Sequence, residues 1–366
     1  MGTIPDYVFD EKDSNEVKDI CMKHIPFWDT LTRDDMVAEF ISSAVTNRVF
    51  KVTLNPELRK RYPLNKVTIK KTTSFNSMMG DIDKQYEVVK FMSDNNCGPK
   101  VVGRFGVYTI QEWVEGTMMS NDSLYNLSVL AGLASSLSKL HKKCTEASPE
   151  HWDRTPFFLR MLSLWAQHLE RVITKLNLDF DHNELLGYHK LVIDILNDHV
   201  KTSDSVANSI LFCHNDLFSL NILDIQHGIY LIDFDFSGFN YVGWEIANFF
   251  REITIVYDTG VPPYFMTDKK LELSYEFQSF FVAVYLSQLL DKNVMPSDNL
   301  VKEFLDSLEI HYLVVDVFWI FWAIIMKDRP HDELNKPVQF EAYGALHNNL
   351  LKEQLTKLRE QKLIKY

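Results

Sequence analysis

Short stretches in which apolar and polar residues alternate dominate the chain before about residue 115, and they predict strands. The predicted strands lie within residues 41–54, 62–72 and 98–116, and the last range holds two of them around a glycine turn. Between these ranges, residues 81–96 place Tyr86, Val89 and Met92 at helical spacing. The pattern therefore predicts a small β-rich lobe, residues 1–115, with a leading segment of polar and amphipathic sequence that includes helix.

Longer helical patterns begin after about residue 120 and continue to the C-terminus. They cover residues 124–143, 157–176, 184–200 and 244–257, followed by further helices. Residues 212–236 interrupt them with a loop and a hairpin whose turn is "DIQHG". The sequence thus predicts an α+β fold with two lobes: residues 1–115 and a large, mainly helical lobe at 116–366. The boundary at Glu115-Gly116 is a candidate hinge.

Composition excludes several classes of protein. Hydrophobic residues make up 46% of the 366 residues and the net charge is −12, so the chain is globular and is not expected to bind nucleic acid. The four cysteines are scattered without a CxxC pair, which fits a reducing compartment. The N-terminus has no signal-peptide pattern. The most apolar stretch, residues 312–326, is short and carries Asp316, so stable membrane insertion is not expected. We expect a cytoplasmic location.

Polar residues that suit metal-assisted chemistry gather in the interrupting segment. In "HNDLFSLN" Asp216 precedes Asn221 by five, and the hairpin "NIL…IYLIDFDF" returns Asp233 beside Asn221. Carboxylate and amide oxygens suit Mg²⁺, and an Asp five residues before an Asn is the spacing of a kinase catalytic loop. A lone Asn-Asp pair is typical of a capped turn. Because three spacings agree here, they favour phosphoryl transfer.

These motifs resemble the choline/ethanolamine kinase family, within the wider class of protein-kinase-like and aminoglycoside-phosphotransferase folds. "HNDLFSLNIL" resembles its catalytic loop, and "LIDFDFSGFNYVGWEIANFFRE" resembles its second signature. The resemblance extends from about Glu39 to about Leu355. It implies a bilobal protein-kinase-like fold, with ATP and Mg²⁺ as cofactors. By this resemblance Asp216 is the catalytic base, Asn221 and Asp233 bind the metal, and His214 and Asn215 hold the loop in shape.

The resemblance also implies a nucleotide site in the first lobe. The stretch "SSAVTNRVFKV" occupies the place of the family's phosphate-covering loop, although Ser43 and Ala44 stand where glycines are common. Lys70, in "VTIKKT", resembles the basic residue on the strand that pairs with the ATP phosphates, and Lys71 points to the opposite face. The expected nucleotide-binding residues are Ser42, Ser43, Thr46, Asn47, Lys70, its helical partner Glu87, and the linker residues Glu112, Trp113 and Val114.

An acceptor site for a small alcohol is implied in the second lobe. Aromatic residues at i, i+3, such as Trp319 and Trp322, are usually core packing. In the family, however, the same WxxW helix lines the choline pocket. Tyr257 and Tyr343 fall near pocket tyrosines, and Glu252 resembles the carboxylate that faces the ammonium group. Aromatic faces with diffuse negative charge suit a quaternary ammonium, which donates no hydrogen bonds.

The leading interpretation is an ATP- and Mg-dependent choline kinase that supplies phosphocholine for phosphatidylcholine synthesis. Ethanolamine kinase is the first alternative. An aminoglycoside-type phosphotransferase ranks lower, because that class usually lacks the Asn-Tyr…Ile-Ala-Asn run and the WxxW helix. A catalytically inactive kinase-like interaction module would have lost Asp216, Asn221 or Asp233, and all three are present. By analogy with the family, we expect a homodimer.

Overall fold

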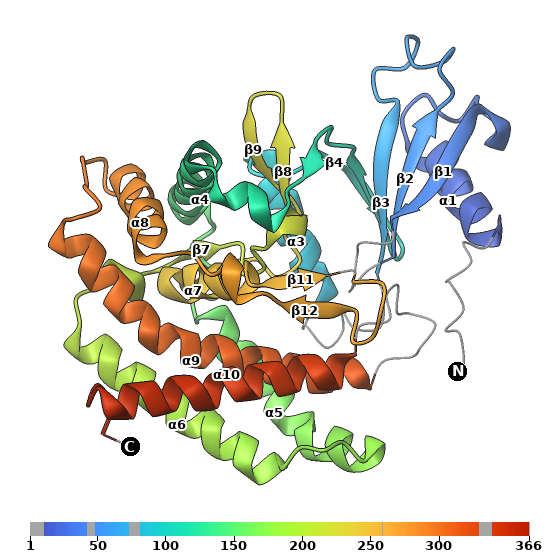
Figure 1. The fold of residues 1–366 in the computed structure, drawn as a ribbon. Helices are drawn as coiled ribbons and strands as arrows, with labels where there is room; N and C mark the ends of the chain where they lie inside the picture. Colours follow the sequence, from blue (N-terminus) through green and yellow to red (C-terminus); the bar gives the residue numbers. More distant parts are fainter. Residues whose placement is uncertain (1–10, 42–47, 73–80, 258, 329–338, 366) are drawn as a thin grey trace. The chain divides into compact units, whose positions relative to one another are not determined.

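The computed structural model describes residues 11–41, 48–72, 81–257, 259–328 and 339–365. The chain divides into two compact units, one reaching Glu115 and the other beginning at Gly116. Figure 1 shows strands β1–β5 of the first unit in blue to green and the helices of the second in green to red. This α+β architecture, with a small antiparallel sheet in one unit and mainly helices in the other, agrees with the fold class expected from the sequence.

Strands of the first unit form one antiparallel sheet in the order β1-β2-β3-β5-β4 within the described residues. They are β1 (Met36–Ile41), β2 (Arg48–Leu54), β3 (Lys66–Lys71), β4 (Val101–Phe105) and β5 (Tyr108–Glu112). The sequence predicted four of them and missed β1. In β1 the buried Met36 and Ala38 alternate with the exposed Val37 and Glu39, and this alternation ends after four residues. The β4–β5 turn uses Gly106 at φ 61°, as the glycine turn predicted.

Helices α1 (Glu11–His24) and α3 (Ile82–Asp94) accompany this sheet. The core of the unit joins Val17 and Cys21 of α1 to Val67 and Ile69 of β3. Successive side chains of a strand point to opposite faces, so Lys70 lies on the other face of β3 from Ile69. Lys71 lies on the α1 side, where its Nζ is 3.3 Å from Glu16 Oε2.

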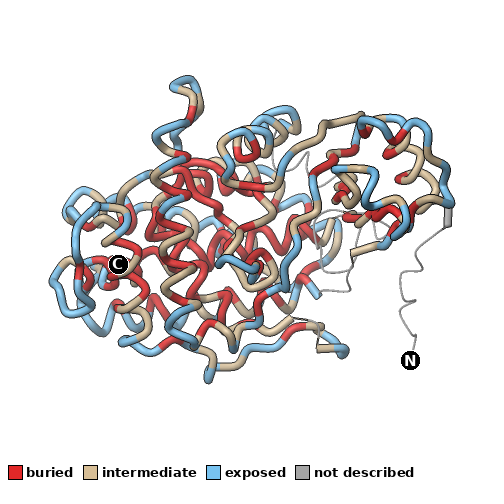
Figure 2. Tube along the Cα trace, turned by 90° about the horizontal axis from the view of Figure 1, so that it is seen from above, coloured by how far each residue is buried: buried red, intermediate tan, exposed pale blue. Residues whose placement is uncertain are grey.

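The second unit is built around helices. They are α4 (Leu127–Ala147), α5 (Phe157–Leu176), α6 (His182–Thr202), α7 (Val242–Glu252), α8 (Tyr275–Leu289), α9 (Asn299–Lys327) and α10 (Phe340–Glu360). Helix α9 packs against α5, α6, α7, α8 and α10, and buried residues run along these helices (Figure 2). By length and composition α9 could cross a membrane, yet 89% of its most apolar window is buried within the protein. It is therefore the central core helix of this unit.

Short strands carry the loop and hairpin that interrupt the helices. Strand β7 (Ile210–Cys213) pairs with β10 (Gly238–Tyr241), and β8 (Ile222–Ile225) pairs with β9 (Gly228–Leu231) and with β6 (Thr117–Met118). The predicted β8–β9 hairpin is thus confirmed.

The predicted helix at 244–257 is wrong at its C-terminal end. Helix α7 ends at Glu252, and β11 (Ile255–Tyr257) then pairs with β12 (Phe265–Thr267). Two features explain the early end. The run Ile253-Thr254-Ile255-Val256 is β-branched, which favours strand. The side-chain amide of Asn121 also donates to the carbonyl oxygens of Ile253 and Ile255, at 2.9 Å each.

Candidate active site

The predicted catalytic loop lies between β7 and the 3-10 helix η4 (Ser219–Asn221). The Asn221 side-chain amide donates to both the backbone oxygen and Oδ2 of Asp216, at 2.9 and 3.0 Å. The Ile232 amide donates to the Asn221 carbonyl at 3.0 Å, which ties the end of the hairpin, and with it Asp233, to Asn221. The side-chain nitrogen Nδ2 of Asn221 donates to Asp216, and the amide oxygen Oδ1 is the atom that can bind a cation.

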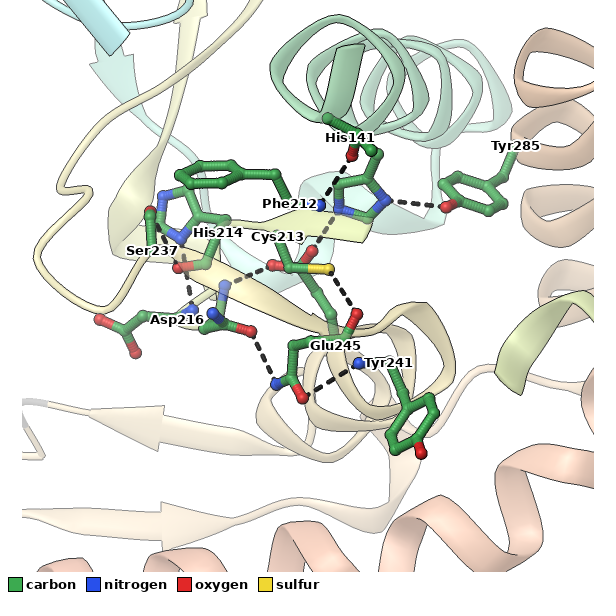
Figure 3. Close-up of polar contacts among 12 residues, drawn as sticks. His141, Phe212, Cys213, His214, Asp216, Ser237, Tyr241, Glu245 and Tyr285 are labelled. Atoms are coloured by element: carbon green, nitrogen blue, oxygen red, sulfur yellow. Dashed lines mark hydrogen bonds and ion pairs between the residues drawn. The ribbon is translucent and has the colours of Figure 1, made fainter. Parts of the chain in front are cut away.

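The residues before Asp216 fix the shape of this loop. The His214 ring nitrogen Nε2 lies 2.8 Å from the Ile232 carbonyl. Asn215 adopts φ 66°, a left-handed conformation that is uncommon outside glycine. Its side-chain amide donates to the carbonyls of Phe236 and Gly238, at 3.0 and 3.1 Å. His214 and Asn215 therefore hold the loop in shape, as the resemblance implied. Figure 3 shows His214 beside Asp216.

Negative charge concentrates at Asp216. Burial raises the pKa of this carboxyl well above its usual value, and the neighbouring carboxylates of Asp233 and Glu252 raise it further. The hydrogen bond from Asn221 acts in the opposite direction. Asp216 is thus a carboxylate with increased proton affinity, and Asn221, Asp233 and Glu252 are all near it. Such a group suits general-base chemistry.

Glu252, the last residue of α7, is the centre of the predicted acceptor site. Its side chain is 5% exposed. The Tyr257 hydroxyl donates to Oε2 at 2.7 Å and the Tyr343 hydroxyl to Oε1 at 2.9 Å. Burial raises the pKa of Glu252, while these two phenols and the nearby His347 partly offset the rise. One buried carboxylate is therefore held by two tyrosines from separate elements.

Two tryptophans of α9 extend this cluster. The rings of Trp319 and Trp322 lie 5.1 Å apart in an edge-to-face arrangement, and Trp322 lies 5.7 Å from Tyr343. The structure thus brings together all the acceptor residues named from the sequence. Sequence reasoning assigned no role to Asn248, whose Oδ1 accepts the Trp319 indole N–H at 2.6 Å. Its spacing was a usable signal, because Asn248 lies one helical turn before Glu252, on the same face of α7.

Phe218 links the acceptor cluster to the catalytic loop. It lies within the loop, and its ring centroid is 5.8 Å from that of Tyr257. The charge of Asp216 also contributes to a raised pKa of Tyr257, which is otherwise caused mainly by burial. The predicted base and the aromatic cluster are therefore parts of one site within the second unit.

Residues expected on the nucleotide side belong to the first unit. Lys70 is on β3 and Glu87 is on α3. Residues 42–47, which include Ser42, Ser43, Thr46 and Asn47, lie outside the described residues. In the linker, the amide of Glu112 donates to the Lys100 carbonyl at 2.8 Å and that of Trp113 to the Lys66 carbonyl at 3.3 Å. Both amides are therefore engaged in the sheet.

Comparison with known proteins identifies the family of this chain. The family model described as choline/ethanolamine kinase matches residues 38–351. The chain belongs to the choline/ethanolamine kinase family. It is 27% identical to a probable choline kinase of Arabidopsis thaliana, over 78% of this chain and 77% of that one. It is 26% identical to a probable ethanolamine kinase of the same plant, over 92% and 84%.

Solved structures with the same fold include a choline kinase from Cryptosporidium parvum. It aligns with a TM-score of 0.83 and 24% identity, covering 96% of this chain and 98% of that one. The fold of this kinase is therefore the bilobal, protein-kinase-like fold predicted from the sequence. Family membership establishes that the chain is a kinase of this family. It does not distinguish choline from ethanolamine as the acceptor, because the relatives include kinases named for each.

The charge at Asp216 predicts a gain in stability when it is removed. Since folding raises the pKa of Asp216, its ionisation opposes folding increasingly as the pH rises above the unfolded-state pKa. In urea denaturation at pH 7 without nucleotide or divalent metal, Asp216→Asn should raise the free energy of unfolding by about 0.5–2 kcal/mol. Asp224→Asn, at an exposed position on the β8–β9 hairpin that follows the loop, should change it by less than about 0.5 kcal/mol. A less stable Asp216→Asn variant would contradict the electrostatic account.

Proposed function

We propose that this kinase transfers the γ-phosphoryl group of ATP to the hydroxyl of choline, and that ethanolamine is the poorer substrate. The product, phosphocholine, would enter phosphatidylcholine synthesis, with the enzyme in the cytoplasm. The observation that carries the proposal is the buried Glu252, whose two oxygens accept the hydroxyls of Tyr257 and Tyr343 beside Trp319 and Trp322. This set offers negative charge and aromatic faces to a cation.

The two amines make different demands on such a site. A trimethylammonium group gains from cation–π and apolar contact and has no N–H to satisfy. A primary ammonium is strongly hydrated, and on entering a buried site it needs several acceptors to replace that water. Here both Glu252 oxygens already accept phenolic hydrogens. The acceptor capacity of the cluster is therefore partly used, which supports choline.

Asp216 would act on the acceptor hydroxyl. Its Oδ2 accepts from Asn221, so the side chain is held in one orientation and Oδ1 is the oxygen directed to the substrate. Increased proton affinity lets this carboxylate accept the hydroxyl proton as the oxygen attacks phosphorus. Glu252 is close enough to Asp216 for its charge to raise the pKa of Asp216. An alcohol whose ammonium lies at Glu252 would therefore have its hydroxyl near Asp216.

The donor set fits Mg²⁺. Asn221 offers an amide oxygen and Asp233 a carboxylate, and Mg²⁺ takes few protein oxygens while keeping water and phosphate in its shell. The crowding of Asp233 and Glu252 around Asp216, which raises the pKa of Asp216, is also the kind of negative charge that a cation relieves. When bound, the metal would neutralise phosphate charge during transfer.

The first unit would hold the nucleotide. Lys71 is paired with Glu16 and its Nζ lies 5.3 Å from the Tyr108 ring centroid, which supports Lys70, on the opposite face, as the phosphate-binding lysine with Glu87. Because the amides of Glu112 and Trp113 are already hydrogen-bonded, we assign to Val114 the linker N–H that would donate to adenine. The serines, Thr46 and Asn47 of residues 42–47 would cover the phosphates.

Ethanolamine kinase activity is the main alternative, and an aminoglycoside substrate is the next. The wild-type enzyme, with Mg-ATP and choline, ethanolamine or kanamycin supplied separately, should release ADP with the highest kcat/KM for choline. Competition between the two amines should show the same order. A higher kcat/KM for ethanolamine would overturn the choline assignment, and turnover with kanamycin alone would overturn the family-based acceptor. No turnover with any acceptor would favour an inactive kinase-like module.

Trp322→Ala should raise the KM for choline by at least about tenfold, because one aromatic face contributes about 1–2 kcal/mol to a desolvated cation. The KM for ATP should change little. Trp322→Phe is the matched control: it keeps an aromatic face, and the buried Trp322 Nε1 has no hydrogen-bond partner among the described residues. An unchanged choline KM in Trp322→Ala would show that this tryptophan has a purely structural role.

A further inference from the structure

A second buried polar cluster lies behind the catalytic loop and uses residues that the proposed reaction does not involve. Glu245 of α7 and His141 of α4 are both 0% exposed, and Oε2 of Glu245 pairs with Nε2 of His141. The other imidazole nitrogen, Nδ1, lies 2.8 Å from the hydroxyl of Tyr285 on α8. Figure 3 shows these three side chains in contact beside the loop. Three helices thus contribute to one hydrogen-bonded chain.

The second oxygen of Glu245 reaches the catalytic loop itself. Oε1 accepts the backbone N–H of Asn215 at 2.6 Å. Asn215 is the residue immediately before Asp216, and its left-handed conformation at φ 66° sets the direction in which the chain enters Asp216. The amide that Glu245 holds therefore belongs to the turn that aims the proposed base.

A buried carboxylate stays ionised only if its surroundings compensate its charge. Burial by itself raises the pKa of Glu245, but His141, His214 and the Asn215 amide together bring it below the usual value. Glu245 is therefore an anion at neutral pH, and a charged acceptor makes a stronger hydrogen bond to an amide than a neutral one does. His141 strengthens the hold on Asn215 without touching the loop.

We propose that Glu245 and His141 are positioning residues for phosphoryl transfer, which hold the Asn215 turn so that Asp216 meets the acceptor hydroxyl. The inference rests on the proposed role of Asp216 as the base. It assigns to Tyr285 the task of orienting the His141 ring. A small misplacement of a reacting group has a large effect on rate, so a residue that acts through Asn215 affects kcat more than substrate binding.

A metal centre is the competing explanation for this cluster. His141, Cys213 and Glu245 offer ligand atoms within 4.8 Å of one another. The thiol of Cys213, however, donates to the Asn240 carbonyl oxygen at 3.6 Å, and burial together with the nearby Glu245 carboxylate raises its pKa well above the usual value. A cysteine binds zinc as its thiolate. A protonated thiol and a direct imidazole–carboxylate pair satisfy each other without an ion.

The test compares variants of Glu245 that differ in what they offer to Asn215. Glu245→Leu removes the acceptor at similar volume, whereas Glu245→Gln keeps one acceptor oxygen and removes the charge. We expect kcat to fall by about 100-fold in the first and by about 10-fold in the second, with the KM values for ATP and the acceptor within about threefold of wild type. His199→Gln, a half-buried histidine bonded to Ser307, is the control and should leave kcat within about twofold.

If Glu245→Leu does not fold, the pair Glu245→Gln and His141→Gln carries the test. Each should lower kcat, and the double variant should be no slower than the slower single variant, because both changes break one unit. Folded variants with wild-type kcat would overturn the inference, as would parallel rises in the KM for ATP and for the acceptor. One equivalent of zinc in wild-type protein, lost in His141→Gln, would instead establish a metal centre. Wild-type turnover, measured first, separates this inference from the proposed function.

Discussion

The crowding of carboxylates around Asp216 is the constraint on which the rest of the site depends. Asp233 and Glu252 both raise the pKa of Asp216, beyond the effect of burial. Like charges held together in a protein interior need cations or protons to balance them. The two outer carboxylates mark the two places where the proposed substrates bring positive charge: Asp233 with the metal on the nucleotide, and Glu252 with the ammonium of the acceptor. Both of these carboxylates act on the proposed base.

One helix supplies the supports for this arrangement. Along α7, Glu245 holds the amide of Asn215, Asn248 holds the indole of Trp319, and Glu252 accepts the two tyrosine hydroxyls. These residues are three and four positions apart, so they share one face of the helix. The helix is buried along nearly its whole length, which makes its position difficult to change. One rigid helix therefore anchors the proposed catalytic loop, Trp319 of α9 and the proposed ammonium site.

The sequence predicted the parts of this protein that local spacing encodes. The five-residue interval between Asp216 and Asn221, the β8–β9 hairpin and the i, i+3 tryptophans are all short-range signals, and the structure shows the corresponding elements. The strand β1 was missed because its alternation spans few residues. Residues 255–257 were assigned to a helix because the hydrogen bonds from Asn121 to Ile253 and Ile255 are long-range contacts, which a local pattern does not encode. The His141–Glu245 pair joins residues 104 positions apart on two separate helices, so no short-range sequence pattern could predict it.

The most direct test of the central claim is the steady-state kinetics of the Asp216→Asn variant, together with its affinity for Mg-ATP. An Asp that accepts the hydroxyl proton acts mainly in the transition state. The account predicts that kcat with choline falls by several orders of magnitude while the dissociation constant for Mg-ATP, measured by calorimetry, stays close to that of the wild type. Near wild-type turnover would show that Asp216 is not the base.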